Sequence, residues 1–245
     1  MLKIRKNYGL YILIFPTILY YVIFHYYPMY GVQIAFKDFI FVKGITGSPW
    51  VGFTHFERFF RSFQFWTLIR NTLGLSLYQL AAGFPAPIIL ALLLNYATNH
   101  KYKRLVQTIT YAPHFISTVV LVGIVYIFLS PRTGIINNVI KLLGGEPVFF
   151  LAKPQWFKTL YVVSGIWQNC GWNAIIYLSA LAGISPELHD SGIVDGANKL
   201  QRIWHIDLPG IMPTAIILLI MNLGKVMDVG FEKAYLMQNS LNIDY

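Results

Sequence analysis

Long apolar stretches without Asp, Glu, Lys or Arg dominate the pattern of hydrophobic and polar positions along the chain. A helix needs about 20 residues to cross the hydrocarbon core of a bilayer, so each charge-free run of that length predicts a transmembrane span. Four runs qualify, at residues 8–30, 71–97, 105–130 and 159–184. A fifth, 209–224, is shorter and spans only if Lys225 and Asp228 hold their charges in the headgroup region. The pattern predicts an all-α integral membrane protein with five spans.

The second predicted span is interrupted at residues 83–87, where Pro85 and Pro87 each remove a backbone donor. Inside a membrane such a break survives where neighbouring helices or a cavity satisfy the freed carbonyl groups. We therefore expect this span to lie inside the helix bundle.

The segments between the spans are also patterned. In 31–70, Thr54 and Glu57 have the spacing of a capping box, and the phenylalanines that follow share one face, which predicts a helix lying on the membrane surface. A second short helix is expected from Gly134 to Leu143. Both a packed outer lid and a contact surface for a partner protein fit these two segments.

Composition supports the membrane interpretation and excludes others. Hydrophobic residues make up 56% of the 245 positions and charged residues 12%, too few charges to solvate a soluble domain of this size. The net charge of +9 does not indicate nucleic-acid binding, because no basic cluster is interleaved with aromatic residues. Lys and Arg are dense in the short segments 1–8 and 98–104, which places both segments and the N-terminus in the cytoplasm.

Enzyme chemistry finds little support. The single cysteine, Cys170, has no partner for a disulfide, and the six histidines form no metal-ligand pair at helical spacing. Glu187 and Asp190 are better explained as solvated charges than as an acid/base pair. We expect no catalytic residue and no metal site.

The cytoplasmic segment 186–209 is too polar to span and too regular for a slack loop. Pro186 suits the first turn of a helix, Gly196 permits a sharp turn, and residues 197–205 can form a second helix before Pro209. A short helical hairpin between two spans suits docking in a groove of a soluble partner. A solvated connecting loop is the alternative.

The same segment resembles the EAA loop of permease subunits in bacterial ABC importers. That signature is Glu-Ala-Ala, three residues, Gly, nine residues and Ile-x-Leu-Pro. Here Asp190-Ser191-Gly192, Gly196 and Ile206-Asp207-Leu208-Pro209 have the same spacing. The first triplet departs from the signature, with Asp for Glu and Ser-Gly for Ala-Ala.

Further motifs are similar to those of the subgroup that imports oligosaccharides and polysaccharide fragments. They are Phe15-Pro16, Tyr27-Pro28-Met29-Tyr30-Gly31, Ala35-Phe36-Lys37-Asp38-Phe39, Asn71-Thr72-Leu73, Ala91-Leu92-Leu93-Leu94-Asn95, Gln107-Thr108, Tyr111-Ala112-Pro113-His114-Phe115-Ile116-Ser117 and Gly230-Phe231-Glu232. Together they cover nearly the whole chain.

The resemblance implies a type I ABC importer permease fold in the bacterial inner membrane. Its parts would be a cytoplasmic tail with the first span (1–30), an extracytoplasmic segment (31–70) and a permease core (71–245), with a sixth span expected beyond the C-terminus. The implied partners are a second permease, two ATPase subunits, an extracytoplasmic solute-binding lipoprotein, the sugar and lipid. The implied ATPase-coupling residues are Asp190, Asp195, Gly196, Ala197, Leu200 and Ile203.

ATP chemistry must come from a partner. The sequence has no Gly-x-x-x-x-Gly-Lys-Ser/Thr phosphate loop, so we expect no cofactor in this chain and assign ATP and Mg to the partner ATPase. Closure of the ATPase subunits would move the docked loop and drive alternating access.

A sugar path needs amide and aromatic side chains within apolar helices. The candidates are Trp167, Gln168, Asn169, Trp172, Asn173 and Asn222. Asn and Gln also join helices to one another, and that alternative stays open. Two other functions stay open as well: a permease for a non-sugar solute, and an ATPase-independent channel or scaffold.

Overall fold

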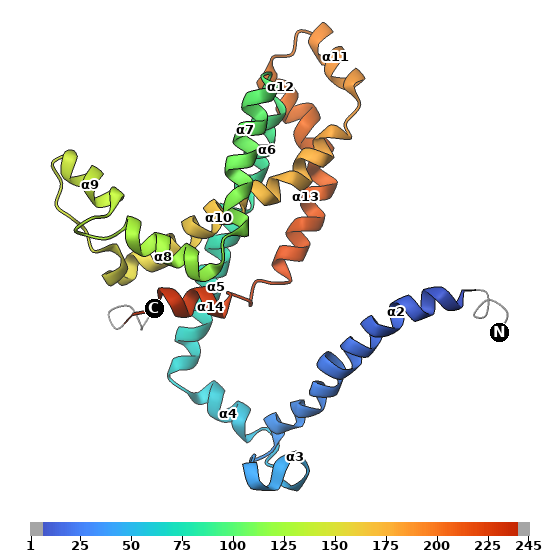
Figure 1. Ribbon diagram of the computed structural model, residues 1–245, viewed down its shortest axis with the longest axis vertical. Coiled ribbons are helices and arrows are strands. Elements are labelled where there is room, and N and C mark those ends of the chain that lie inside the picture. Colours follow the sequence, from blue (N-terminus) through green and yellow to red (C-terminus); the bar gives the residue numbers. More distant parts are fainter. Residues whose placement is uncertain (1–6, 240–245) are drawn as a thin grey trace. The chain divides into compact units, whose positions relative to one another are not determined.

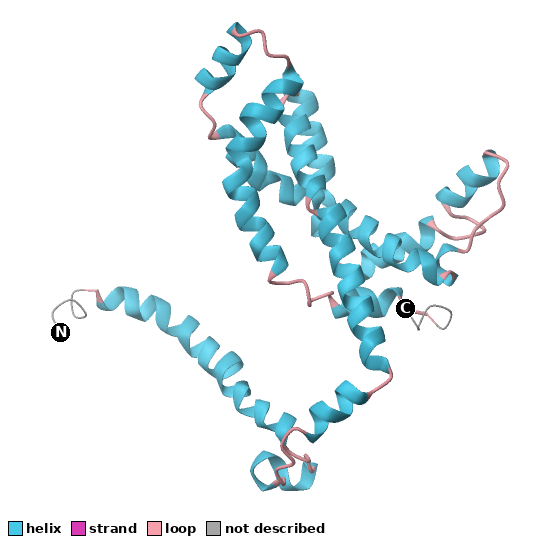
Figure 2. Ribbon diagram, turned by 180° about the vertical axis from the view of Figure 1, so that it is seen from behind, coloured by secondary structure: helices cyan, strands magenta, loops and turns pink. Residues whose placement is uncertain are grey.

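The computed structural model describes residues 7–239, which form helices joined by loops (Figure 2). One isolated bridge pairs Lys37 with Trp50. The chain divides into two compact units, one ending at Leu68 and the other beginning at Ile69. The expected all-α fold is confirmed for the part of the chain described.

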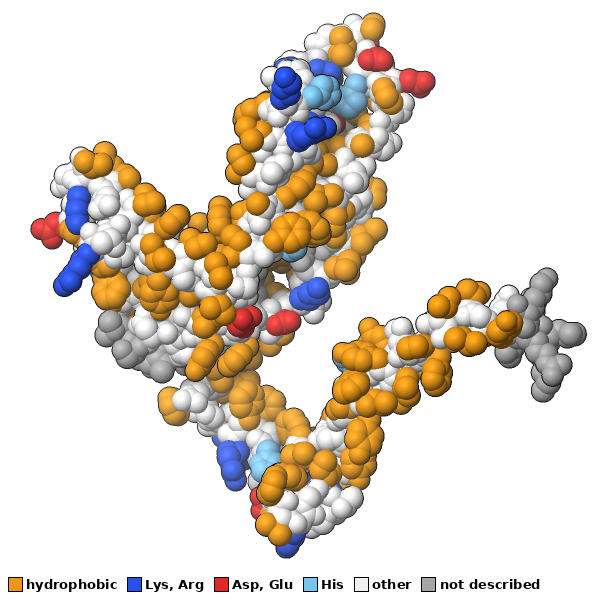
Figure 3. Space-filling model, viewed as in Figure 1, with side chains coloured by type: hydrophobic (Ala, Val, Ile, Leu, Met, Phe, Trp, Pro, Cys, Tyr) orange, Lys and Arg blue, Asp and Glu red, His pale blue; other side chains and the backbone are white. Residues whose placement is uncertain are grey.

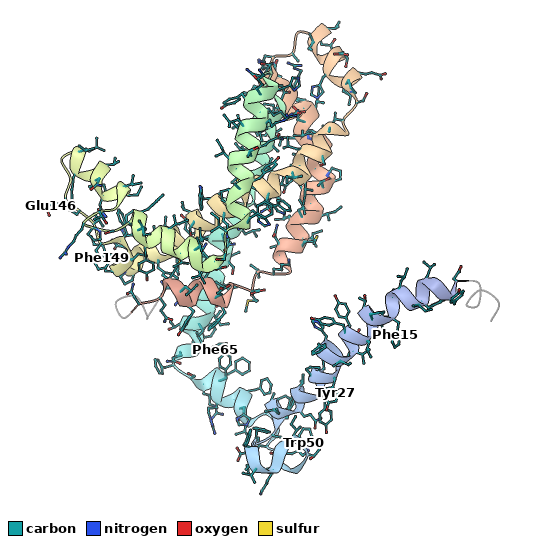
Figure 4. All side chains as sticks on the ribbon, in the orientation of Figure 1. Phe15, Tyr27, Trp50, Phe65, Glu146 and Phe149 are labelled. Carbon is teal, nitrogen blue, oxygen red and sulfur yellow. The ribbon has the colours of Figure 1, made fainter. Side chains whose placement is uncertain are left out.

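The first unit begins with a continuous apolar helix of 29 residues, Tyr8–Phe36. It consists of α2 (Tyr8–Tyr21), the π turn η1 (Val22–Tyr26) and the 3₁₀ segment η2 (Tyr27–Phe36). The change of helix type precedes Pro28, which has no amide to donate to the previous turn. The side chains of α2 are exposed throughout, and Phe15 and Tyr27 project away from the ribbon (Figure 4).

The rest of this unit contains the short helices η3 (Phe41–Lys43) and α3 (Gly44–Gly47), followed by α4 (Thr54–Arg61). Lys37 is buried, and its Nζ donates to the carbonyl of Ile45 at 2.7 Å. The amphipathic helix expected here is confirmed as α4, but the capping box is wrong. The Thr54 hydroxyl donates to the carbonyl of Val51 at 2.7 Å instead of accepting from the Glu57 amide.

A broken helix, α5 (Gln64–Gly83) and α6 (Pro85–Asn95), begins in the last residues of the first unit and continues into the core of the second. The two segments are joined at Phe84, as the prolines predicted, and together run for 32 residues. The next predicted span, 105–130, is not one straight helix. Instead α7 (His100–Tyr111) and η4 (Ala112–Phe115) meet α8 (Thr118–Phe128) at an angle of 108°.

The bend has a local cause. Pro113 provides no amide to the helix, and the Ser117 hydroxyl accepts from the amide of Val120 at 3.4 Å, which starts a new helix. After α8 the chain forms α9 (Ile135–Leu142) and η5 (Phe150–Ala152). The buried side chain of Asn137 links the segments of this region. It donates to the carbonyls of Leu129 and Val148 and accepts from the amide of Val148 at 2.7 Å.

The helix α10 (Pro154–Ala182) is the axis of the second unit (Figure 1). Its C-terminal half packs with α6 and α13 (Leu208–Leu223), where Ala91, Ala174 and Ile211 are buried in one cluster. Its N-terminal half packs with α5, α8 and α14 (Phe231–Met237) around a second buried cluster. In the first cluster the small side chains of Ala91 and Ala174 allow close helix approach, which favours helix association in a membrane.

The remaining elements form the loop between α10 and α13. They are α11 (Pro186–Val194), α12 (Lys199–Arg202) and the π turn η6 (Ile203–Asp207). The second helix of the loop does not end at Pro209, because Lys199–Leu223 is one helix of 25 residues. The π turn directly before Pro209 accommodates its missing amide and its ring.

Three helices among the described residues are long and apolar enough to cross a membrane: Tyr8–Phe36, Gln64–Asn95 and Lys199–Leu223. A fourth crossing exists if the bent pair α7–α8 counts as one span. With 29 residues α10 has the length, but polar side chains such as Gln168, Asn169 and Asn173 lower its mean hydropathy. A multi-pass membrane protein is confirmed, and the predicted number of five spans is not.

Candidate substrate cavity and coupling loop

A polar cavity of about 340 Å³ lies inside the second unit, between α5, α10 and the segment that follows α13. Three of the predicted path residues, Asn169, Asn173 and Asn222, line it. Asn169 and Asn173 are four residues apart on α10 and therefore face the same side of the helix. The other polar side chains of its wall are Ser76, Gln79, Lys225 and Asp228.

The remaining predicted path residues do not line this cavity. The Gln168 amide donates to the carbonyl of Ile116 at 2.8 Å, and the Trp172 ring stacks on His114 with 4.5 Å between centroids. Trp167 is 49% exposed. Gln168 and Trp172 therefore join α10 to the bend before α8, the helix-joining alternative that the sequence left open.

The broken helix contributes to the cavity. Gly83 and Phe84, at the junction of α5 and α6, line it. Pro85 and Pro87 leave the carbonyls of Ala81 and Gly83 without their usual helical donors, and such groups are tolerated at membrane depth beside a cavity. A second cavity of about 310 Å³ shares Gly83, Phe84, Asn173, Asn222 and Lys225 with the first. The predicted break therefore lies at the cavity wall.

Two lysines that the sequence did not select as path residues lie in or next to this cavity. Lys225 lines both cavities, although the sequence indicated an interfacial position for it. Lys233 donates to the carbonyl of Tyr161 at 2.8 Å, and its ammonium lies 4.4 Å from the centroid of the Tyr161 ring. A Cβ built on Gly165, which lines the cavity, would lie 3.2 Å from the Lys233 Nζ. Burial lowers the pKa of Lys233 to about 8.

The loop between α10 and α13 is an ordered helical hairpin. Gly196 adopts a φ of 78°, and the amides of Gly196 and Ala197 donate to the carbonyls of Ile193 and Gly192. This is a Schellman motif, which ends α11 with a residue in the left-handed conformation. Asn198 and Gln201 then form a capping box that starts α12. The predicted turn at Gly196 is confirmed, together with helices on both sides of it.

Comparison with known proteins identifies the family. Residues 83–229 match the family model described as "binding-protein-dependent transport system inner membrane component". The chain belongs to this family. The matched region contains most of the cavity wall and the whole coupling loop, 186–209.

Individual relatives extend the likeness to nearly the whole chain. Protein LplB of Bacillus subtilis (strain 168) is 46% identical, over 99% of this chain and 76% of that protein. The polygalacturonan/rhamnogalacturonan transport system permease protein YteP of the same organism is 42% identical, over 99% of this chain and 75% of that protein.

A solved bacterial ABC transporter involved in the import of the acidic polysaccharide alginate contains a chain with a TM-score of 0.90 and 43% identity. The match covers 99% of this chain and 81% of that chain. A bacterial alginate ABC transporter in complex with a periplasmic protein that holds an alginate pentasaccharide matches with the same TM-score of 0.90 and 43% identity. The type I ABC importer permease fold expected from the sequence is confirmed by this match.

In this permease the predicted coupling residues divide into two groups. Asp190, Asp195, Gly196 and Leu200 are exposed, and Leu200 retains 66% of its surface. Ala197 is partly buried, and Ile203 packs against the buried cluster of α6, α10 and α13. Lys, Arg and His side chains gather with acidic ones at the end of the unit that carries α11 and α12 (Figure 3). The exposed residues offer a surface to a partner, whereas Ile203 connects the loop to the core.

The base of the loop contains a buried carboxylate that sequence reasoning did not select. Asp207 is fully buried, and its Oδ2 accepts a hydrogen bond of 2.7 Å from the Tyr96 hydroxyl. Its Oδ1 lies 3.3 Å from Nε2 of His189, an ion-pair distance without the alignment of a good hydrogen bond. Burial, and after it the hydrogen bond and charge of Asp207, raise the pKa of Tyr96 to about 12.

Proposed function

We propose that this permease imports an acidic oligosaccharide across the bacterial inner membrane, with its polar cavity forming part of the substrate path. The observation that carries the proposal is the cavity itself, in which Lys225 lies with Asn169, Asn173 and Asn222. YteP is named for polygalacturonan, a chain of uronic acids, and the matched solved structure imports alginate, an acidic polysaccharide. Both relatives support a negatively charged sugar.

The cavity has the chemistry that such a substrate requires. Side-chain amides donate to and accept from sugar hydroxyls, and a lysine ammonium pairs with a carboxylate. A charge-assisted hydrogen bond between Lys225 and a carboxylate is stronger than a hydrogen bond between neutral groups. Asp228 lines the same cavity. Its charge would repel a carboxylate, which favours binding of the acidic group on the Lys225 side.

The full transporter would contain a second permease, two ATPase subunits that bind ATP and Mg, and an extracytoplasmic sugar-binding lipoprotein. Three exposed residues of the coupling loop, Asp190, Asp195 and Leu200, would contact an ATPase subunit. The Schellman turn at Gly196 supports this part of the proposal, because it holds the two loop helices in a fixed relation. An N-terminus in the cytoplasm would place the loop on the ATPase side.

The test is transport by the complete complex in proteoliposomes, with Lys225→Gln compared to wild type. We expect uptake of a uronate oligosaccharide to fall by about tenfold, since a hydrogen bond to a charged group contributes about 1.5–3 kcal/mol. Uptake of a neutral oligosaccharide of equal length, where wild type accepts it, should change by less than about twofold. Lys141→Gln, at an exposed position of α9, is the matched control.

Two results would contradict the proposal. If Lys225→Gln lowered the uptake of acidic and neutral sugars equally, Lys225 would support the structure without recognising the carboxylate of the substrate. A wild-type complex that transports no oligosaccharide, but transports another solute, would restore the non-sugar alternative.

A further inference from the structure

The contacts of Asp207 join parts of the permease that are distant in sequence. Tyr96 follows α6 and lies 111 positions before Asp207, and His189 is in α11 of the coupling loop. Asp207 itself ends the π turn between α12 and α13. One carboxylate at the start of the helix that leads back into the membrane therefore contacts the residue directly after α6 and the first loop helix.

The cluster also contains a cation. The guanidinium carbon of Arg202 lies 5.8 Å from the centroid of the Tyr96 ring, and its buried Nε has no hydrogen-bond partner among the described residues. A carboxylate without solvent is costly unless neighbours compensate its charge. Tyr96 and His189 contact the Asp207 carboxylate, and Arg202 lies against the Tyr96 ring. The Tyr96 hydroxyl keeps the proton that it donates to Asp207, because its pKa is raised to about 12.

The two helices held by Asp207 both reach the substrate cavity. At the other end of α6, Phe84 and Pro87 line the cavities, and beyond α13 lies Lys225. An α-helix transmits a displacement of one end to the other, so a shift of the loop at Asp207 would also displace the residues that line the cavity. Without the Tyr96 contact the loop would act on α6 only through apolar packing, including that of Ile203 against the buried cluster of α6, α10 and α13. The Asp207–Tyr96 hydrogen bond adds a direct and directional connection.

We infer that Asp207 is the positioning residue that couples the loop to α6, with Tyr96, the residue directly after that helix, as its partner. The inference rests on the proposed docking of an ATPase subunit on this loop. The exposed face of the loop receives the motion, and the buried Asp207–Tyr96 hydrogen bond passes it to the helix that lines the cavity. His189, 3.3 Å from the other carboxylate oxygen, holds the carboxylate from the side of α11, and Arg202 packs on the Tyr96 ring.

The experiment uses the complete transporter with its binding protein in proteoliposomes and compares Asp207→Asn, Tyr96→Phe and the double variant. We expect ATPase copurification and basal hydrolysis to stay within about twofold of wild type, while sugar moved per ATP falls by about tenfold in each single variant. The double variant should be no worse than either single one, because both changes break the same contact. Glu187→Gln, an exposed carboxylate of α11, and Tyr102→Phe, an exposed tyrosine of α7, are the controls and should transport normally.

Other outcomes overturn the inference in distinguishable ways. If the variants lower the yield or Tm of the complex but leave sugar per ATP unchanged, Asp207 has a structural role only. If the losses of the single variants multiply in the double variant, the two residues act independently. If the Asp207→Asn variant does not assemble, the test uses Tyr96→Phe and His189→Gln instead, since each of these removes one partner of Asp207 and keeps the carboxylate.

The control for the proposed function is copurification of the ATPase with the wild-type chain. If no ATPase copurifies, the proposed docking and this coupling are both wrong. If the ATPase copurifies and the variants transport normally, this inference alone is wrong.

Discussion

Gly196 has a backbone conformation that other residues rarely adopt. Its φ of 78° lies in the left-handed region, where a Cβ crowds the following carbonyl at a cost of roughly 1–2 kcal/mol. No side chain or backbone atom lies within 4 Å of a Cβ built at this position, so the strain comes from the backbone alone. The turn between the two coupling helices depends on that conformation.

We expect Gly196→Ala to weaken the turn by about 1 kcal/mol and to reduce sugar transport per ATP while the chain stays in the membrane. The matched control is Gly192→Ala in the same loop. Its added Cβ would meet the flexible ends of Ile206 and Arg202 at 3.3 and 3.6 Å, and Ala favours the helix there. Transport by both variants in proteoliposomes provides the measurement. Equal coupling in the two variants would show that the left-handed turn is dispensable.

The sequence predicted single residues where the signal was local. Gly196 was found from spacing, and Asn169, Asn173 and Asn222 were found as polar positions in apolar helices. The Tyr96–Asp207 contact was missed, because it joins residues 111 positions apart and neither residue has a local signal of its function. Lys225 was assigned to the membrane interface, since a charge at the end of an apolar run is indistinguishable in sequence from one that lines a cavity.

At the scale of elements, proline positions explain most departures from straight helices. The break at Phe84 was predicted because two prolines lie together there, whereas the single Pro113 in the run 105–130 was not interpreted as a break. A charge-free run specifies that a segment is apolar, but it does not specify that the segment is straight. The 108° bend depends on Ser117, which starts α8, and on contacts with α10 that only the folded chain provides.

The crossing of α10 and α7 allows almost no extra volume. A Cβ built on Gly171 would lie 2.1 Å from the carbonyl oxygen of Thr110, a backbone atom that cannot rotate away. We expect Gly171→Ala to separate the helices, to destabilise the protein by about 1–3 kcal/mol and to lower its Tm in detergent. Gly123→Ala in α8 is the control, because its added Cβ would have no neighbour within 4 Å. An unchanged Tm for Gly171→Ala would mean that the two helices do not cross this closely.

At the scale of the whole molecule, function depends on which side of the membrane each loop occupies. The exposed apolar surface of α2 and the three long apolar helices indicate a bilayer environment, but they do not define the direction of insertion. Direction follows from charge density. Lys and Arg concentrate in the segments 1–8 and 98–104, which predicts that both lie in the cytoplasm. The coupling loop would then also lie in the cytoplasm, because the segment before α10 lies outside and α10 leads the chain back across the membrane.

Cysteine labelling measures this arrangement directly. Cys170 is the single cysteine of the chain, so Cys170→Ser gives a background for single-cysteine variants. In intact spheroplasts a membrane-impermeant maleimide should label Lys141→Cys in α9, whereas Lys101→Cys and Val194→Cys should react only after permeabilisation. All three positions are exposed, so burial would not account for a difference. If Val194→Cys reacted from outside, an ATPase in the cytoplasm could not reach the coupling loop, and the Schellman turn and Asp207 would require another explanation. If it reacts only from inside, the loop lies where a docked ATPase can move it, and Asp207 is placed to pass that motion to α6.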